Sequence, residues 1–433
     1  MPRTTSRLPA RPSSGSRRHS RPGSRLRTAV VVTAAWSALF VMAVPGSADA
    51  VPGPLFADAT YPAPGVRYET FSVAASHGTA HGHLLTVDLD DARVKVELLR
   101  PGTSGAVTGI RAPVSRLADA RGAVAAVNGD FFDITEDEHP GVRPTGSAVG
   151  PAVADGRPLK AAVPDGQRYG PALVPGATGE DVLGIGADGT ARLDRLRLRG
   201  TVVTPPGTWE LAGFNQYALP VNGIGAYTSA WGPASRERAA CGTDDVRAAP
   251  CGTDPYEVTV HNGRVTSVST TLGEGLVPRG TVVLVGREAG ARVLRKLRPG
   301  DPVAVRHRLR ATGRVPLTFA IGGYPVLRDG VPLDGLDETV AATRTAAGFS
   351  RHGHRLYLLA LDGGAEHDDG LTLGELARLL RALGADGAVD LDGGGSSTLV
   401  TRLPDAAHST VRNHPSGVPE RPVPNGIGVI SSA

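Results

Sequence analysis

The chain has 433 residues, with 46 Lys and Arg against 42 Asp and Glu, and a formal net charge of +4 at pH 7. Eight arginines and one aspartate lie in the first 50 residues, which leaves 38 basic (46 − 8) and 41 acidic residues (42 − 1) in the rest. This slightly acidic remainder argues against a nucleic-acid-binding protein, which needs a basic surface. Its length, about 380 residues, suffices for one large domain with an insertion or for two domains.

The first 50 residues have the organisation of a secretory signal peptide. Eight arginines precede an apolar run from Thr28 to Val44, and Ala48-Asp49-Ala50 resembles a cleavage site. The alternative is that this run, although somewhat short for a membrane span, serves as a single N-terminal anchor. Arg17-Arg18 suggests twin-arginine export, but the apolar residues expected next are absent, so the export route stays open. We predict a secreted, extracellular protein with no transmembrane segment in its mature chain.

The chain contains two cysteines, Cys241 and Cys251. In an exported protein such a pair is expected to form a disulfide, here closing a short loop. A metal-binding pair is the alternative, but no further cysteine and no adjacent histidine supplies the remaining ligands.

Sequence patterns divide the part after residue 50 into a leader and one large domain. Residues 51–77 begin proline-rich and are expected to form an extended, loosely held leader. Residues 78–433 are expected to form the domain, within which residues 184–310 carry short apolar runs separated by turn signals such as Asn262-Gly263. This middle region is therefore predicted to be β-rich. Its expected strands are Thr201–Val203, Tyr256–Val260, Arg264–Ser269, Thr281–Val285 and Val303–Leu309.

Shorter patterns precede the middle region. Residues 83–99 alternate apolar and polar side chains, which predicts two strands with a turn at Asp90-Asp91. Residues 113–120 are expected to form a short helix, and residues 123–127 a buried strand that runs directly into Asn128.

The last third contains a predicted strand–helix–strand unit. Residues 355–361 and 388–391 are apolar strands, and each ends in Asp-Gly-Gly. Between them, Thr372 and Glu375 form a capping box for an amphipathic helix that Gly384 ends. A right-handed crossover places both strand ends at one edge of the sheet, where open α/β sheets bind ligands. The predicted fold is α+β, with mixed β-sheets, a few packed helices and the β-rich middle region.

In four segments a strand leads into a turn that combines glycines with polar residues. Glycines there permit positive φ and allow backbone N–H groups to approach a ligand closely. Any one of these segments is explained equally well as a tight turn, but four in one chain favour a shared site. They are Asn128-Gly129-Asp130-Phe131-Phe132-Asp133, Ile321-Gly322-Gly323-Tyr324-Pro325, Arg344-Thr345-Ala346-Ala347-Gly348 and Asp392-Gly393-Gly394-Gly395-Ser396-Ser397.

This combination suits a substrate that carries a phosphate. The planar guanidinium of Arg344 can hold phosphate oxygens, and amides of residues 393–396 can donate to an oxyanion. Asp392 and Asp362 can orient a water or act as a base. The structural alternatives are an ion pair between Arg344 and a neighbouring aspartate, and a turn-capping role for Asp362. Asp390 is expected to be structural.

The order of the motifs resembles the phosphodiester glycosidase family, which includes the uncovering enzyme that removes N-acetylglucosamine from masked mannose 6-phosphate. The resemblance covers about residues 78–430. Asp130 departs from it, because the family has a second glycine there, and Ala347 replaces a bulkier aliphatic residue. Segments similar to the growth-factor-like and membrane parts of the animal enzyme are absent. The motifs are residues 128–132, 146–149, 322–330, 344–346, 361–363, 392–398, 413–417 and 421–425.

The residues and the resemblance together assign a site. The expected catalytic residues are Asp392, Asp362, Arg344, Asn128 and Asp130. The expected substrate-binding residues are Gly129, Gly322, Gly323, Thr345, Gly393, Gly394, Gly395, Ser396, Ser397, Arg421 and Asn425.

The resemblance implies hydrolysis of a glycosyl-1-phosphodiester between the sugar C1 and the phosphate oxygen, with a phosphorylated carbohydrate or envelope glycan as substrate. One alternative is a non-catalytic protein that binds envelope glycans or helps exopolysaccharide to mature. The other is a metal-dependent phosphodiesterase, suggested by His77, His81 and His83, although strand alternation or a surface cluster explains these histidines as well. We expect no required cofactor and no catalytic metal. No known loop spacing supports a structural calcium at the Asp-rich turns.

Overall fold

The computed structural model of the chain describes residues 53–57, 59–102, 105–363, 370–416 and 420–432. The signal peptide expected at residues 1–50, Gly364 of one Asp-Gly-Gly turn, and Gly417 lie outside these residues. Strands dominate the described part, with three α-helices and three short 3-10 helices. The strands form four sheets, and in the described part only β12 and β13 pair in parallel. The fold is therefore mostly β-sheet, and the expected mixed character is confined to one sheet.

The largest sheet has nine strands in the order β1-β3-β4-β22-β21-β23-β19-β20, with β2 paired to β3. The structure differs from the expected loose leader at residues 51–77, since β3 pairs with β4 from Val66↔Val87 to Ala75↔Gly78. Val66 and Phe71 are buried in the core, and their burial explains why this segment joins the sheet. The strand bounds are β1 Leu55–Phe56, β2 Thr60–Ala63, β3 Val66–Ala75, β4 Gly78–Asp88, β19 Tyr324–Arg328, β20 Val331–Pro332, β21 Thr345–Ser350, β22 Arg355–Leu361 and β23 Ala385–Leu391.

A second, five-stranded sheet has the order β25-β24-β6-β26-β5. Successive side chains along its strands point to opposite faces of the sheet. Val127 and Val429 enter the same hydrophobic cluster as the first sheet, whereas Ala126 and Val400 pack against helix α1. The predicted turn at Asp90-Asp91 separates β4 from β5, which lie in different sheets. The bounds are β5 Val94–Leu99, α1 Val114–Arg121, β6 Ala125–Asn128, β24 Leu399–Thr401, β25 Thr410–Val411 and β26 Gly426–Ser431.

The predicted strand–helix–strand unit is β22, helix α3 (Leu373–Ala382) and β23. The capping box is present, because Thr372 Oγ1 accepts from the Glu375 amide and the Glu375 carboxylate accepts from the Thr372 amide. Strand β21 lies between β22 and β23 and is antiparallel to both. The two outer strands therefore run in the same direction, and both end at one edge of the sheet, as the sequence predicted.

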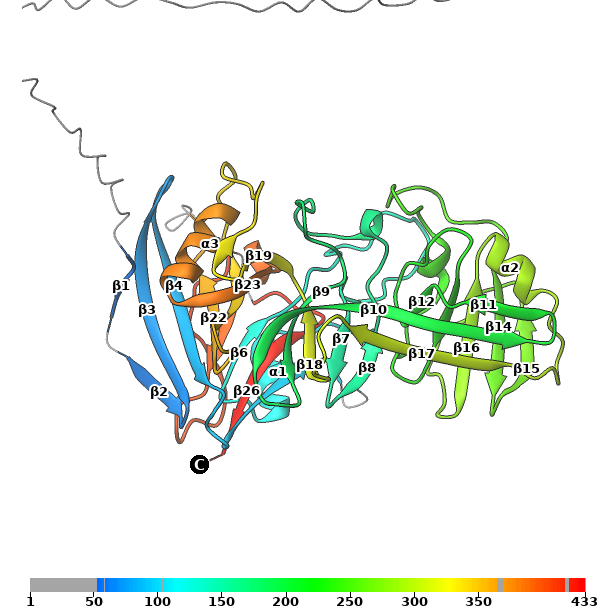
Figure 1. Ribbon diagram of the computed structural model, residues 1–433, viewed down its shortest axis with the longest axis horizontal. Coiled ribbons are helices and arrows are strands. Elements are labelled where there is room, and N and C mark those ends of the chain that lie inside the picture. The colour runs from blue at the N-terminus through cyan, green and yellow to red at the C-terminus, as the bar shows by residue number, and fades with distance from the viewer. Residues whose placement is uncertain (1–52, 58, 103–104, 364–369, 417–419, 433) are drawn as a thin grey trace, which may run out of the picture. The chain divides into compact units, whose positions relative to one another are not determined.

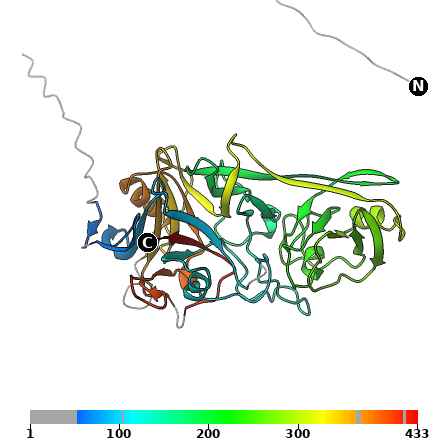
Figure 2. The same cartoon turned by 90° about the horizontal axis from the view of Figure 1, so that it is seen from below.

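The middle region is β-rich, and the expected strands are observed, except that the last of them begins at Ala304 and not at Val303. A seven-stranded sheet has the order β11-β10-β9-β18-β7-β8, with β17 along β10, and a five-stranded sheet has the order β12-β13-β16-β14-β15. Strands β10 and β17 run side by side toward β14 and β15 (Figures 1 and 2). The bounds are β7 Ala152–Ala154, β8 Arg157–Lys160, β9 Asp181–Gly186, β10 Ala191–Thr204, β11 Gly207–Glu210, β12 Gly213–Phe214, β13 Ile224–Tyr227, β14 Tyr256–His261, β15 Arg264–Ser269, β16 Thr281–Gly286, α2 Ala289–Leu294, β17 Ala304–Ala311 and β18 Leu317–Gly322.

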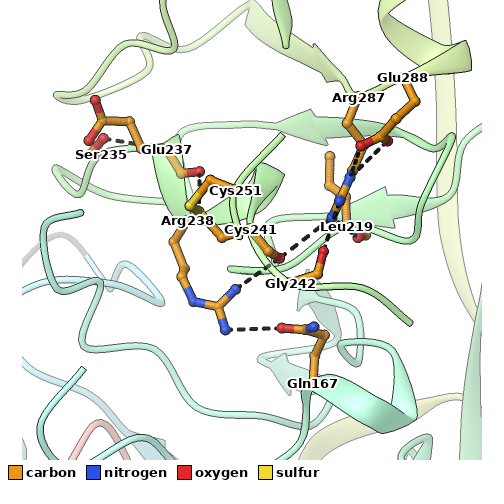
Figure 3. The surroundings of a disulfide bond; sticks show 10 residues. All are labelled: Gln167, Leu219, Ser235, Glu237, Arg238, Cys241, Gly242, Cys251, Arg287 and Glu288. Carbon is orange, nitrogen blue, oxygen red and sulfur yellow. Dashed lines mark hydrogen bonds and ion pairs between the residues drawn. A yellow bond between two sulfur atoms is a disulfide. The ribbon is translucent and has the colours of Figure 1, made fainter. Parts of the chain in front are cut away.

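Cys241 and Cys251 form the expected disulfide in the middle region. Two arginines brace the loop around it: Arg238 donates to Gln167 Oε1 at 3.0 Å, and Arg287 donates to the Gly242 carbonyl at 2.8 Å (Figure 3). His139 also lies beside the sulfurs, but they are bonded to each other, so we do not assign a metal site.

Within the described ranges, no helix combines the length and apolar character that a membrane crossing requires.

Candidate functional site

Strand ends from the nine-stranded sheet and from the five-stranded sheet that contains β6 converge at one place, and a buried asparagine joins them. Asn128, at the end of β6, is completely buried. Its Nδ2 donates to the Asp392 carbonyl at 2.6 Å, and its Oδ1 accepts from Thr345 Oγ1 at 2.8 Å and from the Thr398 amide at 3.0 Å. The expected site residues Asn128, Thr345 and Asp392 therefore lie together. The Asn128 side chain holds the backbone of this site instead of facing a ligand.

Two further buried asparagines close the same region. Asn413 Nδ2 donates to the carbonyls of Leu361 (3.2 Å) and Ser397 (2.9 Å), so it ties the end of β22 to the turn after β23. Asn425 Oδ1 accepts from the Asp130 amide at 3.0 Å. The contact of Asn425 joins segments that are 295 residues apart in the chain.

Asp392 has the most reactive environment of the predicted carboxylates. It is partly exposed, and its Oδ2 is buried without a hydrogen-bond partner among the described residues. Burial raises its pKa to about 6, although the Ser396 hydroxyl and the charge of Arg421 act in the opposite direction. Arg421 Nη1 donates to Ser396 Oγ at 3.2 Å. A carboxylate, a hydroxyl and a guanidinium thus lie together, which is a suitable set for a phosphate-bearing sugar.

Asp390 and Arg344 lie behind this group. Asp390 is completely buried, and neither carboxyl oxygen has a hydrogen-bond partner among the described residues. Burial raises its pKa to about 7, and the charge of Arg344, whose Nη1 lies 3.7 Å from Asp390 Oδ2, only partly offsets this rise. Arg344 also donates to the carbonyls of Leu371 (3.0 Å) and Val340 (3.2 Å). Its guanidinium is thus engaged within the protein, which corresponds to the structural alternative for this residue.

Asp362 is held by two histidines. Its Oδ1 lies 3.0 Å from His83 Nε2 and 3.1 Å from His414 Nδ1, and it accepts from the His414 amide at 2.7 Å. His83 Nδ1 in turn lies 2.7 Å from the Tyr68 hydroxyl. Burial alone raises the pKa of Asp362, but the hydrogen bonds from His83 and His414 lower it to about 2. Such a carboxylate stays ionised near neutral pH, so it is a poor base and a good anchor for the two rings.

Asp130 is also occupied inside the protein. Its carboxylate accepts from the amides of Phe131 (2.8 Å) and Gly150 (2.6 Å). Burial raises its pKa, against the lowering effect of Lys160. Lys160 is itself buried, and burial lowers its pKa to about 8. The carboxylate that replaces a family glycine therefore supports the turn from within.

The expected glycines serve mainly to permit close packing. A Cβ on Gly129 would lie 2.2 Å from Asn425 Oδ1, and one on Gly322 would lie 2.7 Å from Asp130 Oδ2. Gly323 faces Val389 in the same way. Only Gly394, with φ +59°, needs the left-handed region in the turn after β23.

The amides of that turn are mostly engaged. The Gly394 amide donates to the Thr343 carbonyl at 2.8 Å, and the amides of Ser396 and Ser397 donate to the carbonyls of Gly393 and Gly394. These three amides are bonded within the protein, so fewer backbone N–H groups are available to an anion than the sequence predicted. The hydroxyl of buried Ser397, by contrast, has no partner in the described part of the chain. Gly395 packs against Arg421, since a Cβ there would lie 2.3 Å from its guanidinium.

Sequence analysis missed three residues of this region. His414 lies inside a quoted motif but was not assigned a role, and His83 was weighed only as a metal ligand or part of a strand. Asp390 was expected to be merely structural, and only its burial reveals its unusual protonation. Cys241 and Cys251 lie in the middle region, bonded to each other, and contribute no side chain to this group.

The model of the phosphodiester glycosidase family matches residues 255–430. This match confirms the resemblance over that range, which contains Arg344, Asp362, Asp390, Asp392 and Arg421 but not Asn128 or Asp130. The match supports a hydrolase of the phosphodiester glycosidase type. A comparison with curated proteins gave no match.

Solved structures show a similar fold. A hypothetical protein from Synechocystis matches with a TM-score of 0.64 and 20% identity over 85% of this chain and 62% of that one. The present chain thus spans 62% of the length of that protein. A protein from Burkholderia pseudomallei, provisionally named as exported, matches with a TM-score of 0.65 and 21% identity over 87% and 97% of the two chains. The catalytic domain of zebrafish N-acetylglucosamine-1-phosphodiester alpha-N-acetylglucosaminidase, auto-inhibited by its pro-peptide, gives a TM-score of 0.43 at 16% identity over 88% of each chain.

Proposed function

We propose that the protein is an exported hydrolase that cleaves the bond between C1 of a sugar and the oxygen of a phosphodiester. The observation that carries this proposal is the environment of Asp392, a partly exposed residue whose carboxyl has a raised pKa of about 6 and lies beside Ser396 and Arg421. Perturbed carboxyls of this kind gather at catalytic sites. The family match over residues 255–430 supports the same class of reaction.

Arg421 takes the phosphate in this proposal. Among the described residues its guanidinium donates one hydrogen bond, to Ser396 Oγ, so the other N–H groups remain available for phosphate oxygens. Arg344, which the sequence assigned to the phosphate, becomes a positioning residue, because its guanidinium holds the carbonyls of Leu371 and Val340.

Asp392 acts on the sugar side of the scissile bond, as the base or the nucleophile. The departing phosphate is a good leaving group, so strong acid assistance matters less here than in an ordinary glycoside. Asp362 remains ionised and orients the ring of His414, whose side chain is largely exposed, in the way that a buried aspartate orients a catalytic histidine. We place His414 on the substrate side as a proton carrier. The substrate is a sugar-phosphate link in an envelope or extracellular glycan.

The test is a release assay on the mature protein. UDP-N-acetylglucosamine and N-acetylglucosamine-phospho-methylmannoside are supplied in ¹⁸O-water, and both the free sugar and the label in the phosphate are measured. Cleavage at C1–O leaves the phosphate unlabelled. The phosphate is the informative product, because the anomeric hydroxyl of the free sugar exchanges oxygen with water. Label in the phosphate would show P–O cleavage, as a metal-dependent phosphodiesterase performs it.

Three variants sharpen the assay. Asp392→Asn should lose on the order of 10²–10⁴-fold in kcat, the usual contribution of a general acid or base. Arg421→Ala should lose about 10²–10³-fold in kcat/KM, as expected for an anion-stabilising donor, with partial recovery in Arg421→Lys. In the wild type, kcat/KM should rise with pH through about pH 6, where Asp392 ionises. If neither these substrates nor other sugar phosphodiesters turn over, while the same sugars still bind, the protein is a glycan-binding protein.

A further inference from the structure

Five arginines lie on one face of the two-stranded ribbon formed by β10 and β17. The register pairs Arg197 with Arg310 and Arg199 with Arg308, and it places Arg306 opposite Thr201. Directly opposed residues of an antiparallel pair point to the same side, and so does every second residue along a strand. All five arginines are exposed. We call this group the arginine face.

The opposite side of the ribbon fixes this orientation. Val202 and Leu196 are buried in separate hydrophobic clusters, and His307 stacks on Phe214 with ring centroids 4.1 Å apart. The ribbon therefore cannot turn its arginines inward without removing apolar side chains from the core. Figures 1 and 2 show β10 and β17 side by side along their length.

The arginine face has few acidic partners. Only Arg197 is paired, with Glu180 Oε2 at 3.0 Å. Within the described ranges, none of the other four has a carboxylate within ion-pairing distance, although Glu210 lies opposite Thr201 on β11. Some other exposed arginines pair with an acid, as in Arg67–Glu69, Arg93–Asp91, Arg143–Glu274 and Arg378–Glu338. Others among the described residues, such as Arg279 and Arg351, have no such pair, but the register does not group them in a row as it does on the ribbon.

Opposed like charges destabilise a sheet, so an unpaired row of them calls for a ligand of opposite charge. Successive arginines on one strand are about 7 Å apart, and opposed ones about 5 Å apart. At physiological salt the Debye length is about 8 Å, so the charges act as one positive field.

We propose that the arginine face is a binding surface for a polyanionic glycan whose charges are repeating phosphates. Such a chain offers one charge per repeat without bases that need stacking. Binding of single-stranded nucleic acid uses aromatic platforms, and Trp209 on the neighbouring strand β11 is paired with Val202 and so lies on the other face. The surface would hold the polymer while its links are cut at the separate site around Asp392. In this respect the inference builds on the proposed function, but the binding itself does not depend on it.

The test measures binding of a fluorescent polysaccharide that has phosphodiester links in its backbone, at several salt concentrations. The variant Arg199→Gln/Arg306→Gln/Arg308→Gln should bind at least tenfold more weakly, and its log Kd should depend less steeply on log salt, because fewer ions are released. Arg→Lys at the same three positions should largely restore binding. Arg279→Gln/Arg351→Gln, which removes two exposed arginines elsewhere, should bind like the wild type.

Further arms make the outcome decisive. Dextran of equal length should not bind, and a single-stranded DNA oligonucleotide should bind more weakly than the phosphate glycan. Unchanged glycan binding by the triple variant, or equal loss in the Arg279/Arg351 control, would overturn the proposal. Tighter binding of DNA than of glycan would replace it with a nucleic-acid surface. Turnover of a small sugar phosphodiester is measured separately and should be unchanged in the triple variant, so that a failure of the binding surface and a failure of the proposed reaction are distinguished.

Discussion

Replacing Asp390 by asparagine should change how the stability of the protein depends on pH. Burial raises the pKa of this carboxyl from 3.8 to about 7 in the folded state. Between these two values the folded protein keeps a proton that the unfolded chain has released, so the free energy of unfolding falls as the pH rises. The difference of about three pH units, at about 1.36 kcal/mol per unit, gives an upper limit of about 4 kcal/mol. Asp390→Asn abolishes this loss, because the amide does not ionise.

The assay is urea unfolding of the wild type and Asp390→Asn at pH 4 to 8, followed by tryptophan fluorescence, since Trp231 is buried. The amide has its own constant cost of burial, so the informative quantity is the change with pH in the stability difference between the two proteins. This difference should move in favour of the variant by about 2–4 kcal/mol from pH 4 to pH 8. Asp245→Asn, at an exposed position, corrects for the change in net charge.

A pH-independent difference would refute this reasoning. So would an increasing advantage of the wild type at high pH, because it would mean that Asp390 is ionised and forms a stabilising ion pair with Arg344. Arg344 Nη1 lies 3.7 Å from Asp390 Oδ2, but both Asp390 oxygens lack hydrogen bonds among the described residues, so this contact only partly offsets the effect of burial.

Two further predictions concern the framework. Gly129→Ala should destabilise the protein by about 2–4 kcal/mol, because its Cβ would lie 2.2 Å from Asn425 Oδ1 and displace a buried hydrogen bond. The measurement is thermal unfolding, and the matched control is Gly53→Ala, which has open space around the new methyl group. Equal melting temperatures of the two variants would contradict the packing argument. Reduction of the disulfide between Cys241 and Cys251, which are 10 residues apart, should lower the free energy of unfolding by about 2–3 kcal/mol. The measurement is urea unfolding with and without reductant. An unchanged unfolding midpoint would show that the loop needs no cross-link.

Much of the local structure could be predicted from sequence. The helix after Thr372 begins at its capping box because Thr372 and Glu375, three positions apart, contact each other directly. The strands before Asp362 and Asp392 are short apolar runs that end in glycine turns, and both are present as β22 and β23. Their shared edge follows from the helix between them. In each case the determining interactions act over a few residues, so the pattern itself contains the information.

The chemical roles within the site could not be predicted in this way. Arg344 and Asn128 match family motifs, yet their side chains are engaged by partners from other strands. Asp390 and Asp392 are two residues apart on one strand, but only packing decides that one is enclosed and the other reaches solvent. A pKa depends on burial and on charges contributed by distant segments, and these are set by tertiary structure alone.

The sequence by itself therefore determined the turns, the helix cap, the disulfide and the family resemblance over residues 255–430. Tertiary structure alone decided which carboxyl is perturbed, which arginine remains available for a phosphate, and which arginines share a face. The arginine face shows the reason most clearly: Arg199 and Arg308 are 109 positions apart (308 − 199) and lie opposite each other only because β10 and β17 pair in one particular register.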